Sequence, residues 1–164
     1  MTKGNWAMCS PAEWLWESAP MRWRRTYAGR ADQVTAARVF AASLFAGTGR
    51  EDDVALVVAE LASNAVLHTR SGEPGRGWFG LEVTLADVAY IGVTDLGGRC
   101  VPIFQTDRPG CELREGGRGL LTVSKLSIAC GMHGSAHFGH TVWADMALQS
   151  GGHQVAAVEV APAM

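Results

Sequence analysis

The sequence predicts an α/β protein, a two-layer α/β sandwich in which a mixed, largely antiparallel sheet carries three helices on one face. Two observations support this fold class. Segments with apolar residues at helical spacing occur in the same chain as segments that alternate apolar and polar residues. The 164 residues are 48% hydrophobic and 18% charged, which is enough for one domain with a buried core.

The first part of the domain is expected to contain an edge strand and two helices. Residues 22–28 are the expected strand, with aromatic residues among arginines. Residues 32–46 are a predicted helix that ends at Gly47 and Gly49. Residues 53–68 are a second predicted helix, because they lack Gly and Pro and start at aspartates. The residues expected on the buried faces are Val34, Ala37, Phe40, Ala41 and Leu44 in the first helix and Val54, Val58, Leu61 and Ala65 in the second.

The second part is expected to complete the sheet. Residues 78–85 and 88–94 alternate as the two strands of a tight β-hairpin. Residues 101–105 are a further short strand, residues 106–117 are a polar candidate lid, and residues 120–126 are a short helix. The remaining expected elements are strands over residues 127–131 and 141–148, a turn around residues 133–140, and a frayed tail or edge strand within residues 149–164.

The chain is expected to form one domain over residues 22–148, with an N-terminal extension at residues 1–21 and a C-terminal tail at residues 149–164. The extension holds three tryptophans. It is either a leader with aromatic anchors or a short helix that packs on the domain or on a partner. Whether the protein forms a homodimer is left open.

Composition argues against several classes of function. A net charge of −2 gives no general basic field, so direct nucleic-acid binding is not expected. No apolar run approaches the length of about 18–20 residues that spans a bilayer, so a cytoplasmic protein without membrane contact is expected. The four cysteines form no C-x-x-C pair, and the histidines of residues 133–140 lie in a Gly-rich segment, so neither set predicts a metal site.

A polar stripe runs along the helix predicted for residues 53–68. Glu60, Asn64 and His68 recur every four residues beside the apolar stripe, at the edge of the expected core. A carboxylate and a carboxamide lose water there, which costs about 1–3 kcal/mol each unless another group replaces it. A ligand or a metal would replace it, and the alternative is a solvated helix flank.

Two glycine-containing motifs follow. Asp95 comes at the end of a predicted strand, before Gly97 and Gly98, where a flat ligand can approach the backbone and a carboxylate can accept a hydrogen bond from an exocyclic amine. The alternative is an ordinary Asp-Gly turn. Residues 116–119, GGRG, precede a helix, where backbone N–H groups surround phosphate oxygens, although a flexible helix entry has the same composition. Neither the P-loop nor the G-x-G-x-x-G pattern is present.

Four segments taken in order resemble a known superfamily. They are DVALVVAELASNAVLH (53–68), VTDLGG (93–98), EGGRGLL (115–121) and GHTVWADM (139–146). They resemble the N box, the two glycine boxes and the terminal box of the GHKL ATPases, which have the Bergerat fold. The closest resemblance is to the small single-domain branch of bacterial anti-sigma-factor serine kinases and related ATP-binding regulators of actinomycetes, and it covers about residues 22–148.

The resemblance implies Mg-ATP as the ligand and assigns roles to individual residues. Asn64 would be the only protein ligand of Mg²⁺, and Glu60 would act as general base on an attacking hydroxyl. Asp95 would read the adenine amino group, and Thr141 would present its hydroxyl to the base, although strand threonines are common without a ligand. The other implied nucleotide contacts are Gly97, Gly117, Arg118, Gly119 and Leu120. His140 departs from the pattern, because the family usually has Lys there.

Three functions remain open on these grounds. The first is a serine/threonine kinase that sequesters a sigma factor and phosphorylates its small antagonist protein. The second is a binding module that uses ATP and ADP as a switch for a partner, without turnover. The third is a structural domain whose pocket has decayed. A histidine kinase would need a long helix that carries its phosphoacceptor histidine, for which the chain leaves no room upstream.

Overall fold

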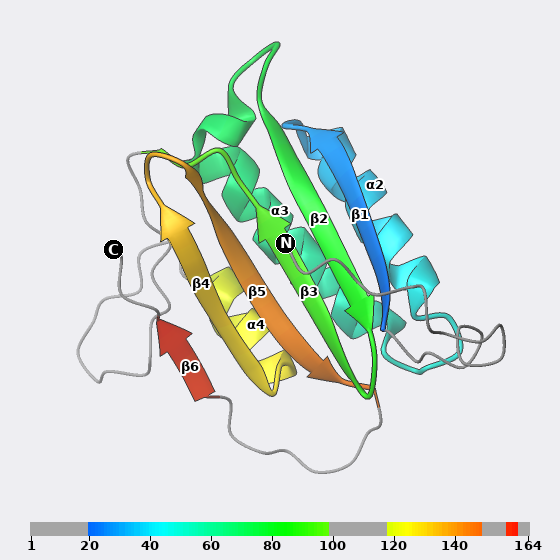
Figure 1. Ribbon diagram of the computed structural model, residues 1–164. Coiled ribbons are helices and arrows are strands. Elements are labelled where there is room, and N and C mark those ends of the chain that lie inside the picture. The colour runs from blue at the N-terminus through cyan, green and yellow to red at the C-terminus, as the bar shows by residue number, and fades with distance from the viewer. Residues whose placement is uncertain (1–19, 99–117, 149–156, 161–164) are drawn as a thin grey trace, which may run out of the picture.

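The computed structural model describes residues 20–98, 118–148 and 157–160, and the expected strand at residues 101–105 and the candidate lid lie outside them. The described residues form a single six-stranded sheet with three α-helices on one face (Figure 1). The strands are β1 (Met21–Ala28), β2 (Trp78–Leu85), β3 (Val88–Thr94), β4 (Ala129–Ser135), β5 (Gly139–Ala147) and β6 (Ala157–Val160). The helices are α2 (Ala31–Leu44), α3 (Glu51–His68) and α4 (Arg118–Leu126), with a 3-10 turn, η2 (Arg70–Gly72).

The strand order is β1-β2-β3-β5-β4-β6. All neighbouring pairs are antiparallel except β4 and β6, which run parallel. The predicted two-layer α/β sandwich with a mixed, largely antiparallel sheet is therefore confirmed. In Figure 1, α2 lies behind β1 and β2, α3 behind the middle of the sheet, and α4 behind β4 and β5, so all three described α-helices lie on one face.

The core lies between the helices and the covered face of the sheet. The buried side chains of α3 include the four that were predicted: Val54, Val58, Leu61 and Ala65. In α2, Ala37 and Ala41 are buried, while the other predicted residues pack against the core in partly buried positions. Burial of each such Val or Leu side chain contributes about 1.5–3 kcal/mol, and this attachment fixes α3 across the sheet.

Local side-chain chemistry explains where the helices begin and end. The Glu51 carboxylate accepts a hydrogen bond from the backbone N–H of Gly47 at 2.6 Å, so α3 begins two residues before the predicted start. Phe45 is fully buried, and the chain turns away after it through Gly47, which has a φ of 84°. Helix α2 therefore ends at Leu44, before the predicted residue 46.

The hairpin of β4 and β5 differs from the prediction. The prediction gave a strand at residues 127–131 and a long turn, whereas the two strands stay paired from Ala129 opposite Asp145 to Ser135 opposite Gly139. The glycines that suggested a turn serve close backbone contact instead, because a side chain on Gly134 would collide with the carbonyl oxygen of Gly139. The expected edge strand near the C-terminus is present as β6, which pairs with β4.

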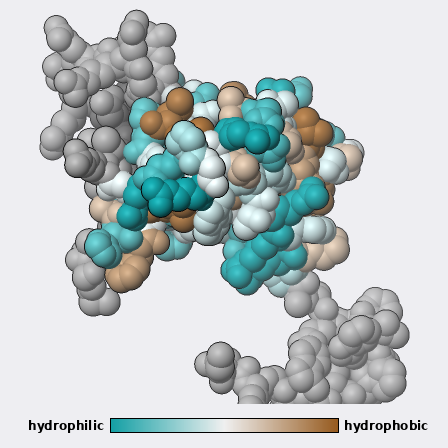
Figure 2. All heavy atoms as spheres, turned by 90° about the horizontal axis from the view of Figure 1, so that it is seen from above, coloured by the Kyte–Doolittle hydropathy of each residue, from teal (hydrophilic) through white to brown (hydrophobic). Residues whose placement is uncertain are grey.

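The end of the sheet at the top of Figure 1 carries the connections from η2 to β2 and from β4 to β5. Seen from above, this end is largely hydrophilic, with separate hydrophobic patches (Figure 2). One of its exposed residues is Phe138, at 90% exposure in the β4–β5 turn. The polar loops beside the C-terminal end of α3 therefore lie at this end of the molecule.

Candidate functional site

The polar stripe of α3 faces the start of α4. Glu60 and Asn64 are half-buried, and neither side chain forms a hydrogen bond or ion pair with another residue in the described part of the chain. The Glu60 carboxylate lies against Gly119, so closely that a Cβ atom on Gly119 would collide with Glu60 Oε2. The structure thus brings together two motifs that are more than fifty residues apart in the sequence.

Helix α4 is fixed against α3 at both ends. At its C-terminal end, the Arg50 guanidinium donates to the carbonyl oxygen of Leu126 at 3.2 Å and pairs with Asp53 at 2.9 Å. Its apolar side enters the core through Leu120 and Val123, which are 8% and 0% exposed. Because packing and the Arg50 contacts hold the helix, its N-terminal turn stays beside Glu60.

Asp95 is held at the end of β3 and is 4% exposed. Its Oδ1 atom accepts hydrogen bonds from the backbone N–H groups of Gly97 at 2.5 Å and His140 at 3.0 Å. Its own N–H donates to the carbonyl oxygen of His140 at 2.8 Å. The bond to Gly97 is that of an Asp-Gly turn. It uses only Oδ1, and Oδ2 has no hydrogen-bond partner among the described residues.

A hydrogen-bonded cluster around Arg70 fixes the loop after Asp95. The Arg70 guanidinium donates to the carbonyl oxygens of Leu96 at 2.6 and 3.0 Å and of His137 at 3.0 Å. The backbone N–H of Arg70 donates to Gly97 at 2.7 Å, and the Leu96 N–H donates to the Ser71 hydroxyl at 3.0 Å. This Arg70 cluster joins η2, the loop after β3 and the β4–β5 turn.

Sequence reasoning missed the Arg70 cluster, because residues 70–77 carry only the signature of a polar, Gly-rich turn. Both glycines after Asp95, Gly97 and Gly98, lie close to the Arg70 cluster. Gly97 has a φ of 70°, and a side chain there would collide with the Ala136 carbonyl oxygen. A Cβ on Gly98 would lie 3.3 Å from the Cα of Thr69. A glycine at each position therefore permits close contact with the chain's own backbone, and the approach of a flat ligand that was expected at Gly97 and Gly98 stays a prediction.

A cavity of about 440 Å³ lies at the C-terminal end of α3. The residues that line it are His68, Thr69, Arg70, Glu73, Gly98 and Ala136. Since His68 continues the stripe of Glu60 and Asn64, the stripe extends from Gly119 at one end to this cavity at the other.

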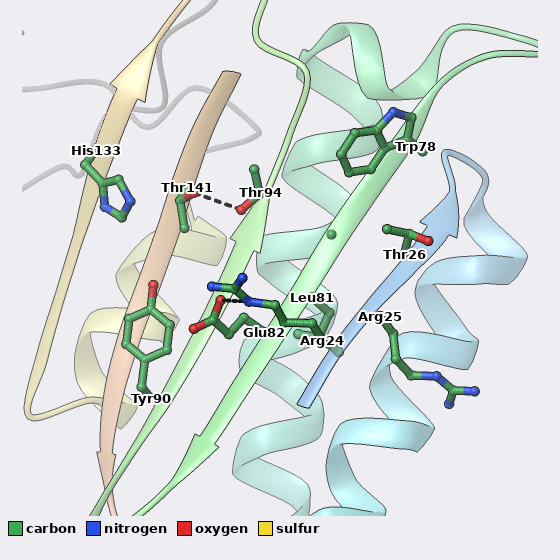
Figure 3. A pocket seen from close by; sticks show the side chains of 11 residues that line it. Arg24, Arg25, Thr26, Trp78, Leu81, Glu82, Tyr90, Thr94, His133 and Thr141 are labelled. Carbon is green, nitrogen blue, oxygen red and sulfur yellow. Dashed lines mark hydrogen bonds and ion pairs between the residues drawn. The ribbon is translucent and has the colours of Figure 1, made fainter. Parts of the chain in front are cut away.

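The alternation of β5 places His140 and Thr141 on opposite faces of the sheet. His140 is 3% exposed and shares the covered face with Asp95. The Thr141 hydroxyl lies on the open face, 2.8 Å from the Thr94 hydroxyl (Figure 3). The structure therefore does not bring the Thr141 hydroxyl together with Asp95, as the sequence had suggested, and it brings His140 there instead.

The His140 ring has an unusual environment. Its Nδ1 atom is buried and has no hydrogen-bond partner among the described residues. The nearest carboxylate oxygen, Asp95 Oδ1, is 3.7 Å away, which is too far for a hydrogen bond. The ring that was predicted to replace a lysine is thus buried beside the predicted base-reading carboxylate.

Comparison with known families agrees with this geometry. A family model described as the histidine kinase-like ATPase domain matches residues 27–146, which is most of the chain. The chain belongs to this family. A comparison with curated proteins found no match. As a histidine kinase-like ATPase domain of the GHKL superfamily, this is an ATP-binding domain, and the matched range includes Glu60, Asn64, Asp95 and Gly119.

The ATPase domain also carries a cavity on the open face of its sheet. This cavity has a volume of about 640 Å³, and both polar and apolar side chains line it (Figure 3). The labelled side chains around it are Arg24, Arg25, Thr26, Trp78, Leu81, Glu82, Tyr90, Thr94, His133 and Thr141. Arg24 is paired with Glu82 at 2.6 Å, as Thr94 is with Thr141.

Some predicted contacts of the ATPase domain fall at the limits of the described residues. Gly117 lies outside them, and only the backbone of Arg118 is described. Gly119 and Leu120 form the first turn of α4. Within the described ranges, no group of three or more His, Cys, Asp or Glu side chains is placed to hold a metal ion, and no helix is long and apolar enough to cross a membrane.

Proposed function

We propose that this protein is a Mg-ATP-dependent serine/threonine kinase of the anti-sigma-factor type, which transfers the γ-phosphoryl group of ATP to a hydroxyl of a small antagonist protein. The observation that carries the proposal is the position of the Glu60 carboxylate. It is half-buried, has no partner among the described residues, and lies against Gly119 where α4 begins. A carboxylate beside a helix N-terminus that binds phosphate is suited to accept the proton of an attacking hydroxyl.

The remaining polar groups support the same proposal. Asn64 lies one helical turn from Glu60 and is half-buried, so its carboxamide oxygen is available as a single protein ligand for Mg²⁺. When bound, the metal ion would neutralise charge on the transferred phosphoryl group. Asp95 Oδ2 is available to accept a hydrogen bond from the adenine amino group.

The partners in this proposal are a sigma factor, which the protein sequesters, and the antagonist that it phosphorylates. Both follow from the resemblance to the anti-sigma-factor kinases.

A second candidate function is a nucleotide-dependent binding module without turnover. The observation that favours it is that no described side chain orients the Glu60 carboxylate by a hydrogen bond. A general base is usually oriented by a third group. In this alternative, ATP and ADP act as a switch for partner binding.

The Glu60→Gln variant separates the two functions. Under the kinase proposal, nucleotide affinity measured by calorimetry survives, while phosphoryl transfer from γ-labelled ATP to a candidate antagonist falls by about 10²–10⁴-fold. Asp52→Asn is the matched control, because Asp52 is exposed on the same helix and its substitution removes the same negative charge. Transfer that persists in Glu60→Gln would exclude Glu60 as the base. Binding without transfer in the unmodified protein would favour the switch.

A further inference from the structure

The buried His140 ring has a polar atom for which the described residues supply no partner. His140 is 3% exposed, and its Nδ1 atom is buried and unpaired. Buried polar groups almost always have a partner, because an unpaired donor or acceptor loses its hydrogen bond to water without replacement. An unpaired nitrogen next to an expected ligand site indicates a group that the ligand contacts.

The groups around the His140 ring determine whether its Nδ1 atom donates or accepts a hydrogen bond. The backbone of His140 is fixed by two hydrogen bonds with Asp95, one to Oδ1 at 3.0 Å and one from the Asp95 N–H at 2.8 Å. The Nδ1 atom lies 3.7 Å from Asp95 Oδ1, which already accepts two backbone bonds. A carboxylate at this distance favours the tautomer with the proton on Nδ1. The pair then presents an acceptor, Asp95 Oδ2, beside a donor, His140 Nδ1–H.

We infer that His140 is a specificity-determining residue of the nucleotide site, and that its Nδ1–H donates to ring nitrogen N1 of a 6-aminopurine whose amino group donates to Asp95. This inference rests on the proposed function, because it places a nucleotide at the site. It assigns to a buried histidine of this chain the role that the sequence suggested for Thr141, whose hydroxyl lies on the opposite face.

The order of the two groups selects the base. Adenine carries a donor, the amino group, next to an acceptor, N1, which complements an acceptor next to a donor. Hypoxanthine and guanine carry a carbonyl oxygen next to an N–H in the same place, so both contacts would be reversed. A buried site that is built for one hydrogen-bonding pattern rejects the reversed pattern strongly, since its own groups are left unpaired.

Affinities for matched nucleotides test the inference in the full-length protein. The ligands are Mg-ATP, Mg-ITP and the 1-deaza analogue of ATP, which lacks only the N1 acceptor. The unmodified protein should bind the 1-deaza analogue about tenfold more weakly than ATP, and ITP more weakly still. His140→Leu should bind ATP about tenfold more weakly and the 1-deaza analogue as the unmodified protein does.

Two further variants guard against a general loss of structure. His140→Asn retains a carboxamide that can donate near the Nδ1 position, so it should recover part of the preference for ATP over the 1-deaza analogue. Asp145→Asn, on the open face of β5, should leave this preference unchanged. If His140→Leu keeps the full preference, or if Thr141→Val loses it, His140 does not read the base and the inference is overturned.

The outcomes also separate the inference from the proposed function. Tight ATP binding with no effect of N1 would overturn only the role of His140. If the unmodified protein bound neither ATP nor ADP, the proposed function would fail, and the inference would fail with it.

Discussion

The two faces of the sheet differ in whether their polar groups have hydrogen-bond or ion-pair partners. On the open face several polar side chains pair with one another, as Arg24 does with Glu82 and Thr94 with Thr141. On the helix side of the sheet, one set of polar groups around Asp95 and the polar stripe of α3 has no partner among the described residues. These groups are Glu60, Asn64, Asp95 Oδ2 and His140 Nδ1.

The difference indicates which face carries the function. An unpaired polar group in a buried place costs about 1–3 kcal/mol, whereas a half-exposed one that pairs with a neighbour costs little. His140 Nδ1 is buried and Glu60 and Asn64 are half-buried, so together with Asp95 Oδ2 they form a set of groups that a polar ligand would satisfy. The open face has the larger of the two cavities described above, but two of the polar pairs that line it, Arg24 with Glu82 and Thr94 with Thr141, already satisfy each other.

Among the variants that test this contrast between the two faces, Asp95→Asn should have the largest effect. The new carboxamide keeps an oxygen for the N–H groups of Gly97 and His140, but it places an NH₂ group where Oδ2 was. A donor would then face the amino group of the base, so ATP affinity should fall by about 100-fold or more. Calorimetric titration measures the affinity, and thermal unfolding should show a nearly unchanged midpoint. A normal affinity would remove Asp95 from the site.

Gly119→Ala should have an intermediate effect. It should lower phosphoryl transfer while it leaves the stability unchanged or raises it. The new methyl group would displace the Glu60 carboxylate, whose flexible end can move away. Alanine in place of glycine favours a helix by about 1 kcal/mol, so the unfolding midpoint should stay or rise. Under the kinase proposal, phosphoryl transfer should fall about tenfold or more, because the displaced Glu60 carboxylate would be misplaced as the base. An active Gly119→Ala variant would show that the contact has no role in catalysis.

Thr94→Val should affect stability alone. It removes the 2.8 Å hydrogen bond to the Thr141 hydroxyl on the open face, which is worth about 0.5–1.5 kcal/mol. Denaturant unfolding measures this loss, and the nucleotide affinity should not change. A weakened nucleotide affinity would mean that the open face contributes to the site, and the contrast between the faces would be lost.

The smallest expected effect comes from Asp145→Asn, on the open face. Burial raises the pKa of the Asp145 carboxyl above its ordinary value. The folded state therefore holds this proton more tightly than the unfolded state, and stability is lost as the pH rises from the ordinary to the raised pKa. The asparagine variant should unfold at a slightly higher temperature near neutral pH, and this gain should vanish below the ordinary pKa. An equal gain at every pH would contradict this cause.

Short-range patterns in the sequence predicted most of the fold. The bounds of the β2–β3 hairpin are those that alternation and a tight turn predicted, and the buried face of α3 follows from helical spacing. The β4–β5 hairpin was predicted less well, because glycines mark both turns and close backbone contacts. Whether the candidate site residues have the roles predicted for them remains to be tested by the experiments above.

The sequence itself indicated which face of the sheet carries the His140 side chain, but the prediction did not use that signal. Val142, Ala144 and Met146 are apolar at every second position, and His140 is in phase with them, whereas Thr141 is not. An assignment that moves by one residue along a strand transfers the side chain to the other face. The Arg70 cluster had no such local signal, since its partners belong to distant segments.

The long reach of the Arg70 cluster has a consequence for folding. Its guanidinium binds carbonyl groups that lie 26 and 67 residues further along the chain. Contacts of such long sequence separation form only when the intervening chain is ordered, so the Arg70 cluster is complete only when the β4–β5 turn lies beside η2. The same contacts should also slow amide hydrogen exchange at Leu96 relative to local turns, because the amide opens only when segments from three parts of the chain separate.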